Sequence, residues 1–233
     1  MERPKIYNAE NKEGFGHNVT VEIDLMRHAE KASIDGPITE KGRQEAAEFG
    51  KDKNLKVYHS DALRAVQTGT EVARDSLYTA RARNELAFKH KMSTEYVQKY
   101  AEITKQNEGD ESAAVQIYLD TDEDRPDETT WSSREVSEGL ASTLQHFVDV
   151  SARLYNGSRS HIALISHSGQ IEHVLVDLFG EDRSGFIEKI GGGLRFLEGA
   201  KFTIARDSAG GLTIKLEFRG RSKEIDPKLL EAL

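Results

Sequence analysis

Two short apolar runs, each ending close to a histidine, constrain the fold of this chain more than any other feature. Residues 19–26 lead through Arg27 to His28, and residues 162–166 lead directly to His167. Runs of this length and apolarity are typical of strands buried inside a parallel sheet. Because ligands bind outside the carboxyl ends of the strands in open α/β sheets, we expect both imidazoles to face one pocket.

Segments with the length and apolar spacing of helices follow these runs in a repeating strand-then-helix order. The predicted strands are residues 19–26, 56–59 and 162–166, and the predicted helices are residues 39–49, 61–74 and 169–179. This alternation predicts an α/β fold, a three-layer α/β/α sandwich with a mostly parallel central sheet and helices on both faces. Residues 201–205 and 212–218 flank a glycine-containing turn, which predicts an antiparallel edge hairpin near the C-terminus.

Residues that commonly bound helices stand at the predicted helix ends. The candidate N-terminal caps are Thr39 and either Ser60 or Asp61, and the candidate stops are Gly50 and Gly180. Ser132 and Glu135 have the spacing of a capping box and predict the start of a long helix that ends near residue 156. Residues 227–233 are expected to form a short helix.

The length and composition of the chain suit one domain that spans residues 1–233. Its 233 residues are 37% hydrophobic and 31% charged, which is enough for a full core. The regular order is interrupted between residues 87 and 130, where a predicted helix at 93–104 precedes an acidic stretch. Long excursions inside compact domains are usually lids or binding loops, so we interpret residues 87–130 as an inserted lid or cap.

The charge is concentrated in that insertion. The formal net charge of the chain is −8, and residues 107–128 hold nine acidic residues and one arginine. The chain has no basic stripe, so we do not expect it to bind nucleic acid. The acidic stretch should also repel polyanionic substrates. No apolar stretch is long enough to cross a membrane, and the chain has no cysteine. We therefore expect a cytoplasmic protein, and its oligomeric state is left open.

Four short motifs occur in order along the chain. They are Leu25-Met26-Arg27-His28-Ala29-Glu30, Thr39-Glu40-Lys41-Gly42, the segment from Ser60 to Thr68, and Ser166-His167-Ser168-Gly169. Together they resemble the histidine phosphatase superfamily, also called phosphoglycerate-mutase-like, over most of the chain. The resemblance implies hydrolysis of a small phosphorylated substrate through a phosphohistidine, with no cofactor and no metal ion.

The resemblance also implies a role for each motif residue. His28 would be the nucleophile, and His167 would be the second histidine, which contacts the phosphoryl oxygens. Arg27 and Arg64 are the expected phosphate clamps, because a guanidinium binds two oxygens at once and stays protonated. Backbone amides near Ser168, at a predicted helix start, would add donors to the phosphate.

A carboxylic acid that protonates the leaving oxygen is the remaining part of such a site. Glu85 is the candidate, because Asn84-Glu85 resembles the Asn-Glu pair of the mutase branch. The glycine-containing sequence that usually follows that pair is missing here, and Ala29 replaces the commoner glycine. Glu30 is a weaker alternative acid, and a solvated surface role for Glu85 stays open.

Other interpretations stay open at this stage. Within the same chemistry, the chain could be a phosphoglycerate mutase or a protein phosphohistidine phosphatase. From another class, it could be a non-catalytic module that binds a phosphorylated ligand. The basic residues 89–91 are interpreted as a solvated turn, although they could meet a second anionic group of a substrate.

Overall fold

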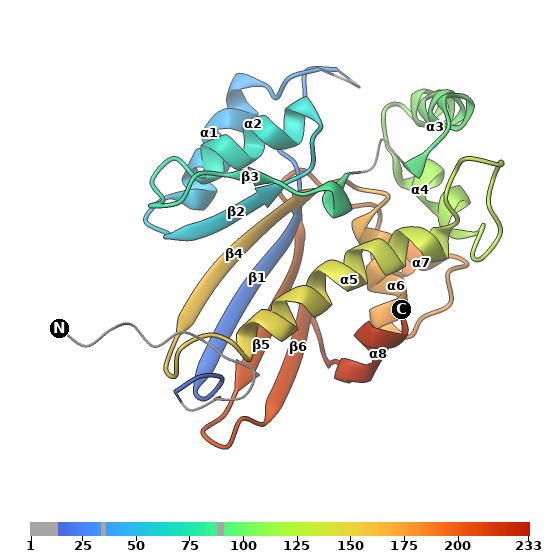
Figure 1. Cartoon of the computed structure of the whole chain (residues 1–233). Helices are drawn as coiled ribbons and strands as arrows, with labels where there is room; N and C mark the ends of the chain where they lie inside the picture. Colours follow the sequence, from blue (N-terminus) through green and yellow to red (C-terminus); the bar gives the residue numbers. More distant parts are fainter. Residues whose placement is uncertain (1–13, 34–35, 88–90) are drawn as a thin grey trace.

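The computed structural model describes residues 14–33, 36–87 and 91–233. Within these residues, seven strands form one sheet in the order β3-β2-β4-β1-β5-β6-β7 (Figure 1). The strands are β1 (Val19–Arg27), β2 (Leu55–His59), β3 (Arg81–Ala82), β4 (Arg159–Ser166), β5 (Gly199–Arg206), β6 (Leu212–Phe218) and β7 (Arg221–Glu224). The first four strands of the chain run parallel, and β5, β6 and β7 are antiparallel.

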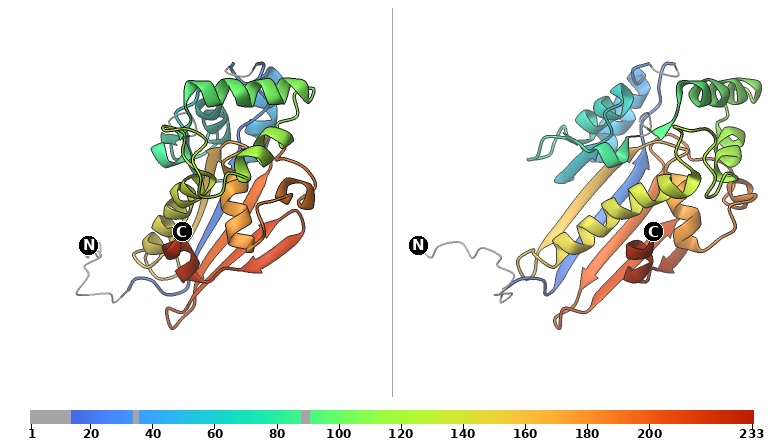
Figure 2. Two further views of the ribbon diagram at one scale, coloured as in Figure 1. Left: turned by 90° about the vertical axis from the view of Figure 1, so that its right-hand side faces the viewer. Right: turned by 45° about the vertical axis from the view of Figure 1, so that its right-hand side comes forward.

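Helices cover both faces of this sheet and make it the middle layer of three. One face carries α1 (Glu40–Gly50) and α2 (Leu63–Val72), and the other carries α5 (Ser133–Ser151), α6 (Ile171–Phe179) and α8 (Pro227–Ala232) (Figure 1). Three further helices are α3 (Thr94–Gln106), α4 (Ser112–Leu119) and α7 (Phe186–Lys189), and Asn84–Leu86 form a 3-10 turn, η1. Both views in Figure 2 place α3 and α4 toward the end of the sheet where β1 and β4 finish. The predicted three-layer α/β/α architecture is confirmed.

In the described ranges, no helix combines the length and the apolarity that a membrane crossing requires.

Two apolar clusters fix the central strands from opposite sides. Ile23 and Leu25 of β1 belong to the larger cluster, beneath α5 and α6. Met26 and Ile165 belong to the smaller cluster, beneath α1 and α2. Because successive side chains of a strand point to opposite faces, both clusters hold β1 and β4 at once. The carboxyl ends of these two neighbouring strands are therefore rigid supports.

Several of the predicted helix ends are confirmed, and two are wrong. The long helix predicted to end near residue 156 already ends at Ser151. The Thr39 hydroxyl accepts a hydrogen bond from the Gly42 amide at 2.9 Å, and Ser132 forms the expected capping box with Glu135. Gly180 ends α6 in the left-handed conformation, at a φ of 67°. However, α2 begins only at Leu63, and neither Ser60 nor Asp61 caps it. The Ser60 hydroxyl contacts His167 instead, so a site interaction replaces the cap.

The insertion contains more structure than the sequence predicted. The helix expected at residues 93–104 is α3, with Ser93 as its cap. The acidic stretch also contains α4, which the charge pattern did not predict. Val115 and Leu119 of α4 are fully buried in the larger cluster, so this helix packs on the main core.

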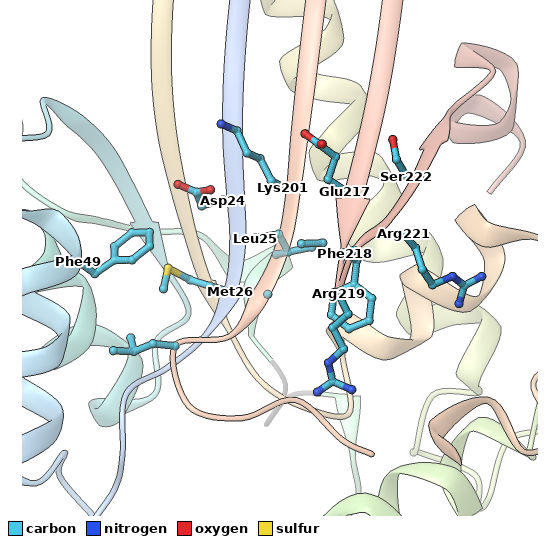
Figure 3. Close-up of a pocket in the computed structure, with 14 residues that line it drawn as sticks. Asp24, Leu25, Met26, Phe49, Lys201, Glu217, Phe218, Arg219, Arg221 and Ser222 are labelled. Atoms are coloured by element: carbon cyan, nitrogen blue, oxygen red, sulfur yellow. The ribbon is translucent and has the colours of Figure 1, made fainter. Parts of the chain in front are cut away.

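The C-terminal strands differ from the prediction by one element. The hairpin of β5 and β6 is present, but β7 adds a further antiparallel strand, so β6 is not at the edge. A cavity of about 340 Å³ lies on this part of the sheet, beside Phe49 of α1 (Figure 3). Asp24, Lys201 and Glu217 line it, and none of the predicted site residues does so.

Candidate active site

His28 follows the last residue of β1 and is 2% exposed. Its Nδ1 lies 2.8 Å from the Ala29 carbonyl oxygen, and the Arg64 Nε donates to its Nε2 at 3.0 Å. A carbonyl only accepts and a guanidinium only donates, so these partners assign the ring proton to Nδ1. The Nε2 lone pair therefore faces Arg64.

Arg64 reaches His28 because α2 is tied to the segment after β1. The Thr68 hydroxyl donates to the Arg64 carbonyl at 2.7 Å and accepts from the Ala29 amide at 3.0 Å. One side chain thus joins the first turn of α2 to the residue that follows His28. This link fixes the distance between the two parts of the site.

His167 directly follows β4 and lies beside His28, since β1 and β4 are paired with Arg27 opposite Ser166. The two imidazole centroids are 5.3 Å apart, with the rings tilted by 62°. The His167 Nε2 is 2.7 Å from the Ser60 hydroxyl, which lies at the end of β2. Three neighbouring parallel strands therefore deliver His28, His167 and Ser60 to one place.

Both site imidazoles are held in the neutral form. Burial lowers the pKa of His28 well below its ordinary value of 6.5, and the nearby His167 and Arg64 charges lower it further. Burial also lowers the pKa of His167, with Arg64 as the next largest cause. At neutral pH, the His28 Nε2 is therefore an unprotonated nitrogen beside a permanent cation.

A cavity of about 300 Å³ opens onto these groups. Its polar floor includes four of the predicted site residues, namely His28, Arg64, His167 and Ser168. Its wall includes side chains from α3 and the segment before it, namely Met92, Val97 and Tyr100. The insertion thus supplies one wall of the cavity next to the paired histidines.

Arg27 lies next to this cavity but does not line it. Its Nη1 donates to the Leu194 carbonyl at 2.5 Å, its Nη2 is 3.0 Å from a Glu111 carboxylate oxygen, and its guanidinium stacks 4.4 Å above the Phe196 ring. Arg27 borders an adjoining cavity of about 420 Å³, which shares Lys31 and Glu111 with the first. Glu111 therefore stands between Arg27 and the paired histidines.

Ser168 is in the cavity, but the helix start beside it is already satisfied. The Ser168 hydroxyl and the Gly169 amide both donate to Glu172, each at 2.8 Å. Glu172 also accepts from the Leu194 amide at 3.0 Å, and burial raises its pKa. The Gly169 amide is therefore bound to Glu172 and is not one of the phosphate donors. Glu172 instead connects Ser168 to Leu194, whose carbonyl binds Arg27.

Glu85 is anchored near the site through its backbone. Its carbonyl accepts from the Lys91 Nζ at 3.0 Å and from the Gln170 Nε2 at 3.2 Å. Its side chain is exposed and is not among the described residues that line the cavity. Lys91 is 4% exposed, and burial lowers its pKa to about 8, so it does not belong to a solvated turn. Residues 89 and 90 lie outside the described residues.

The sequence analysis missed three residues of this site. Lys31 and Glu111 line both cavities, and Ser60 holds His167. Glu111 belonged to an acidic stretch without a helical pattern, so only its place in the fold reveals its contacts. Ser60 stood inside a recognised motif but was interpreted as a cap.

The other histidines in the described part of the chain have structural contacts. His59 bonds the Ser60 carbonyl, His161 pairs with Asp24 at 2.7 Å, and His173 bonds the Ser133 hydroxyl at 2.6 Å.

Comparison with known proteins identifies the family. The model of the histidine phosphatase superfamily (branch 1) matches residues 23–190, so the chain belongs to this superfamily. The search of curated proteins gave no match.

Solved structures with the same fold include both phosphatases and a mutase. A mycobacterial glucosyl-3-phosphoglycerate phosphatase has a TM-score of 0.57 at 16% identity, covering 85% of this chain and 98% of its own. A phosphoglycerate mutase from Bacillus anthracis also has a TM-score of 0.57 at 16% identity, covering 93% and 97%. A phosphoserine phosphatase from Entamoeba histolytica, in complex with 3-phosphoglyceric acid, has a TM-score of 0.55 at 17% identity, covering 90% and 99%. At these identities the likeness shows a shared fold.

Proposed function

We propose that this protein is a phosphatase that hydrolyses a small phosphomonoester through a phosphohistidine on His28 and needs no metal ion. One observation carries the proposal. The Nε2 of a buried, neutral His28 lies 3.0 Å from a guanidinium nitrogen and faces a cavity that His167 also lines. A nucleophile with a fixed cation beside it is what transfer of a phosphoryl group requires.

The reaction proceeds in two steps. In the first, the His28 Nε2 attacks phosphorus, an N–P bond forms, and the bond from phosphorus to the alcohol oxygen breaks. The Nδ1–H bond to the Ala29 carbonyl stabilises the positive charge that develops on the ring. In the second step, water attacks phosphorus, the N–P bond breaks, and phosphate leaves with His28 restored.

Positive charge around the phosphoryl group lowers the barrier of both steps. Arg64 leaves the His28 Nε2 lone pair as phosphorus approaches it and binds phosphoryl oxygens, and His167 and the Ser168 backbone amide contribute hydrogen bonds from the same cavity. Arg27 is the second clamp that we propose. Its guanidinium is bound to Glu111 in this structure, so a phosphoryl oxygen must share it with that carboxylate.

Glu85 is the acid and base that we propose for the leaving oxygen and the attacking water. Gln170, which lies three residues after His167, holds the Glu85 carbonyl and so places η1 beside the end of β4. Among the described residues, no ion pair holds the exposed side chain of Glu85, whereas Glu111 is paired with two cations.

Hydrolysis of 4-nitrophenyl phosphate in a buffer with EDTA tests the proposal. The native protein is expected to release 4-nitrophenol, and His28→Asn is expected to lose at least about a thousandfold in kcat/KM. His146→Asn, at an exposed position of α5, is the matched control and is expected to keep full activity. Equal activity of the His28→Asn variant and the native protein would contradict the proposal.

Two further outcomes distinguish the alternatives. Incubation with 3-phosphoglycerate is expected to give no 2-phosphoglycerate, whereas formation of 2-phosphoglycerate would identify a mutase. Tight binding of phosphate without turnover of any phosphomonoester would identify a binding module.

A further inference from the structure

The carboxylate of Glu111, a residue of the inserted segment, lies between two cations near the carboxyl end of β1. One of its oxygens is 3.0 Å from the Arg27 Nη2, and the other is 3.1 Å from the Lys31 Nζ. The side chains of Arg27, Lys31 and Glu111 are only 9%, 14% and 15% exposed. Ion pairs shielded from solvent to this degree are weakly screened, so the three charges act as one unit.

The position of Glu111 is set by contacts at the start of α4. Glu111 is the residue that precedes this helix, and Ser112 follows it. The Ser112 amide donates to Asp110 at 2.8 Å, and the Ser112 hydroxyl accepts from the Gly193 amide at 2.9 Å. Gly193 precedes Leu194, whose carbonyl binds Arg27. The same turn therefore positions both the arginine and the carboxylate that neutralises it.

The charges around the cavity match one phosphate and no further anion. Around the two adjoining cavities, Arg27, Lys31, Arg64 and Lys105 supply four positive charges, and Glu111 and Asp110 remove two of them. The remaining two balance the dianion of a phosphomonoester. Among the described residues that line the cavity of His28 and His167, Lys31 and Arg64 are the cations, and Lys31 is already paired with Glu111. A second anionic group of a substrate would meet the Glu111 carboxylate instead of a free cation.

The part of the cavity beyond the phosphate site is mostly apolar, with Thr94, Gln98 and Thr104 as its uncharged polar residues. Ala62, Met92, Val97 and Tyr100 line it together with the charged residues. Apolar and aromatic walls favour an apolar ligand surface, since contact removes both surfaces from water. The alcohol half of the substrate is expected to lie against this wall.

We propose that Glu111 determines substrate specificity, by excluding phosphomonoesters with a second anionic group and leaving those with an uncharged, apolar alcohol half. The inference rests on the proposed function, because it concerns the same cavity.

A matched pair of ligands tests this inference. Phenylphosphonate and 4-carboxyphenylphosphonate are not hydrolysed and differ by a single carboxylate, so titration calorimetry compares their dissociation constants directly. The native protein is expected to bind phenylphosphonate at least about tenfold more tightly, because like charges that face each other are costly. Equal affinities would overturn the inference without any substitution of the protein.

Substitution of Glu111 assigns the effect to this residue. In Glu111→Gln, Lys31 is free to meet the added carboxylate, and the ratio of the two dissociation constants is expected to fall at least about fivefold. Glu123→Gln removes the same charge at an exposed position of the same acidic stretch and is expected to leave the ratio unchanged. An unchanged ratio in Glu111→Gln, or an equal fall in Glu123→Gln, would overturn the inference.

The two proposals fail in different ways. If phenylphosphonate binds but phenyl phosphate is not hydrolysed, the phosphatase proposal fails, and the affinity ratio still tests Glu111. If phenyl phosphate is hydrolysed but the ratio is near one, only the role of Glu111 fails. Binding of neither phosphonate would overturn both.

Discussion

The Arg64 Nε donates to the His28 Nε2 at 3.0 Å, so the proposed nucleophile and the proposed phosphate clamp are already in contact. The contact uses the nitrogen of Arg64 that is nearest its chain and neither of its two terminal nitrogens. It also fixes the orientation of the His28 ring, and phosphorus would take the place of Arg64 on the Nε2 lone pair when substrate binds. Orientation of this kind, established before substrate arrives, is a main source of catalytic rate.

Arg64→Lys is expected to lower kcat/KM for 4-nitrophenyl phosphate about a hundredfold or more. An ammonium keeps the charge but cannot bind two phosphoryl oxygens in one plane as a guanidinium does. Arg74→Lys, at an exposed ion pair just beyond α2, serves as the control and should change kcat/KM little. A similar loss in both variants would show that the loss is not specific to the position of Arg64 beside His28.

His28 and His167 are expected to titrate below pH 6.5 in the native protein, because burial and neighbouring cations lower the pKa of both. NMR titration of the imidazole ring protons checks this. Signals that disappear in His28→Asn and His167→Asn assign the two rings. A midpoint of either ring at or above 6.5 would contradict the neutral nucleophile.

The free energy of unfolding is expected to decrease as the pH falls below 6.5. The pKa values of His28, His167 and His173 are all well below their ordinary 6.5 in the folded state. Below pH 6.5 the unfolded chain binds protons that the folded chain does not, so stability is present above that pH and is lost toward the folded-state pKa. Each such proton changes the unfolding free energy by about 1.4 kcal/mol per pH unit.

Thermal unfolding between pH 5 and pH 8 measures this dependence, and His173 offers the cleanest variant because it lies outside the cavity. In His173→Asn the amide replaces the ring nitrogen that bonds Ser133, and the dependence on pH is expected to become shallower. A curve as steep as that of the native protein would show that His173 does not bind its proton on unfolding.

The strand ends were the predictable part of this site. Alternating apolar runs place His28 and His167 at neighbouring carboxyl ends, and the pattern around Arg64 fixes the helix that meets them. The insertion was not predictable in the same way. Glu111 reaches Arg27 only because a turn more than 80 residues further along the chain positions both residues, and no local pattern records a contact of that kind. Likewise, the capping propensity of Ser60 was outweighed by its bond to His167.

Glu85→Gln tests the acid that completes the proposed mechanism. It is expected to lower kcat about a hundredfold for an alkyl phosphate, whose leaving oxygen needs a proton, and much less for 4-nitrophenyl phosphate. Glu95→Gln, at an exposed position of α3, is the matched control. Equal small effects on both substrates would remove Glu85 from the mechanism, and would fit a phosphohistidine substrate, whose imidazole leaves with less help.

Direct capture of the phosphoenzyme tests the central claim most sharply. The native protein is mixed with a ³²P-labelled phosphomonoester, quenched within milliseconds, and its modified residue is located by mass spectrometry. We predict an acid-labile, base-stable phosphoryl group on His28 that is absent from His28→Asn and appears at a rate no slower than turnover. Turnover at the native rate with no label on His28, or with the label on another residue, would contradict the account.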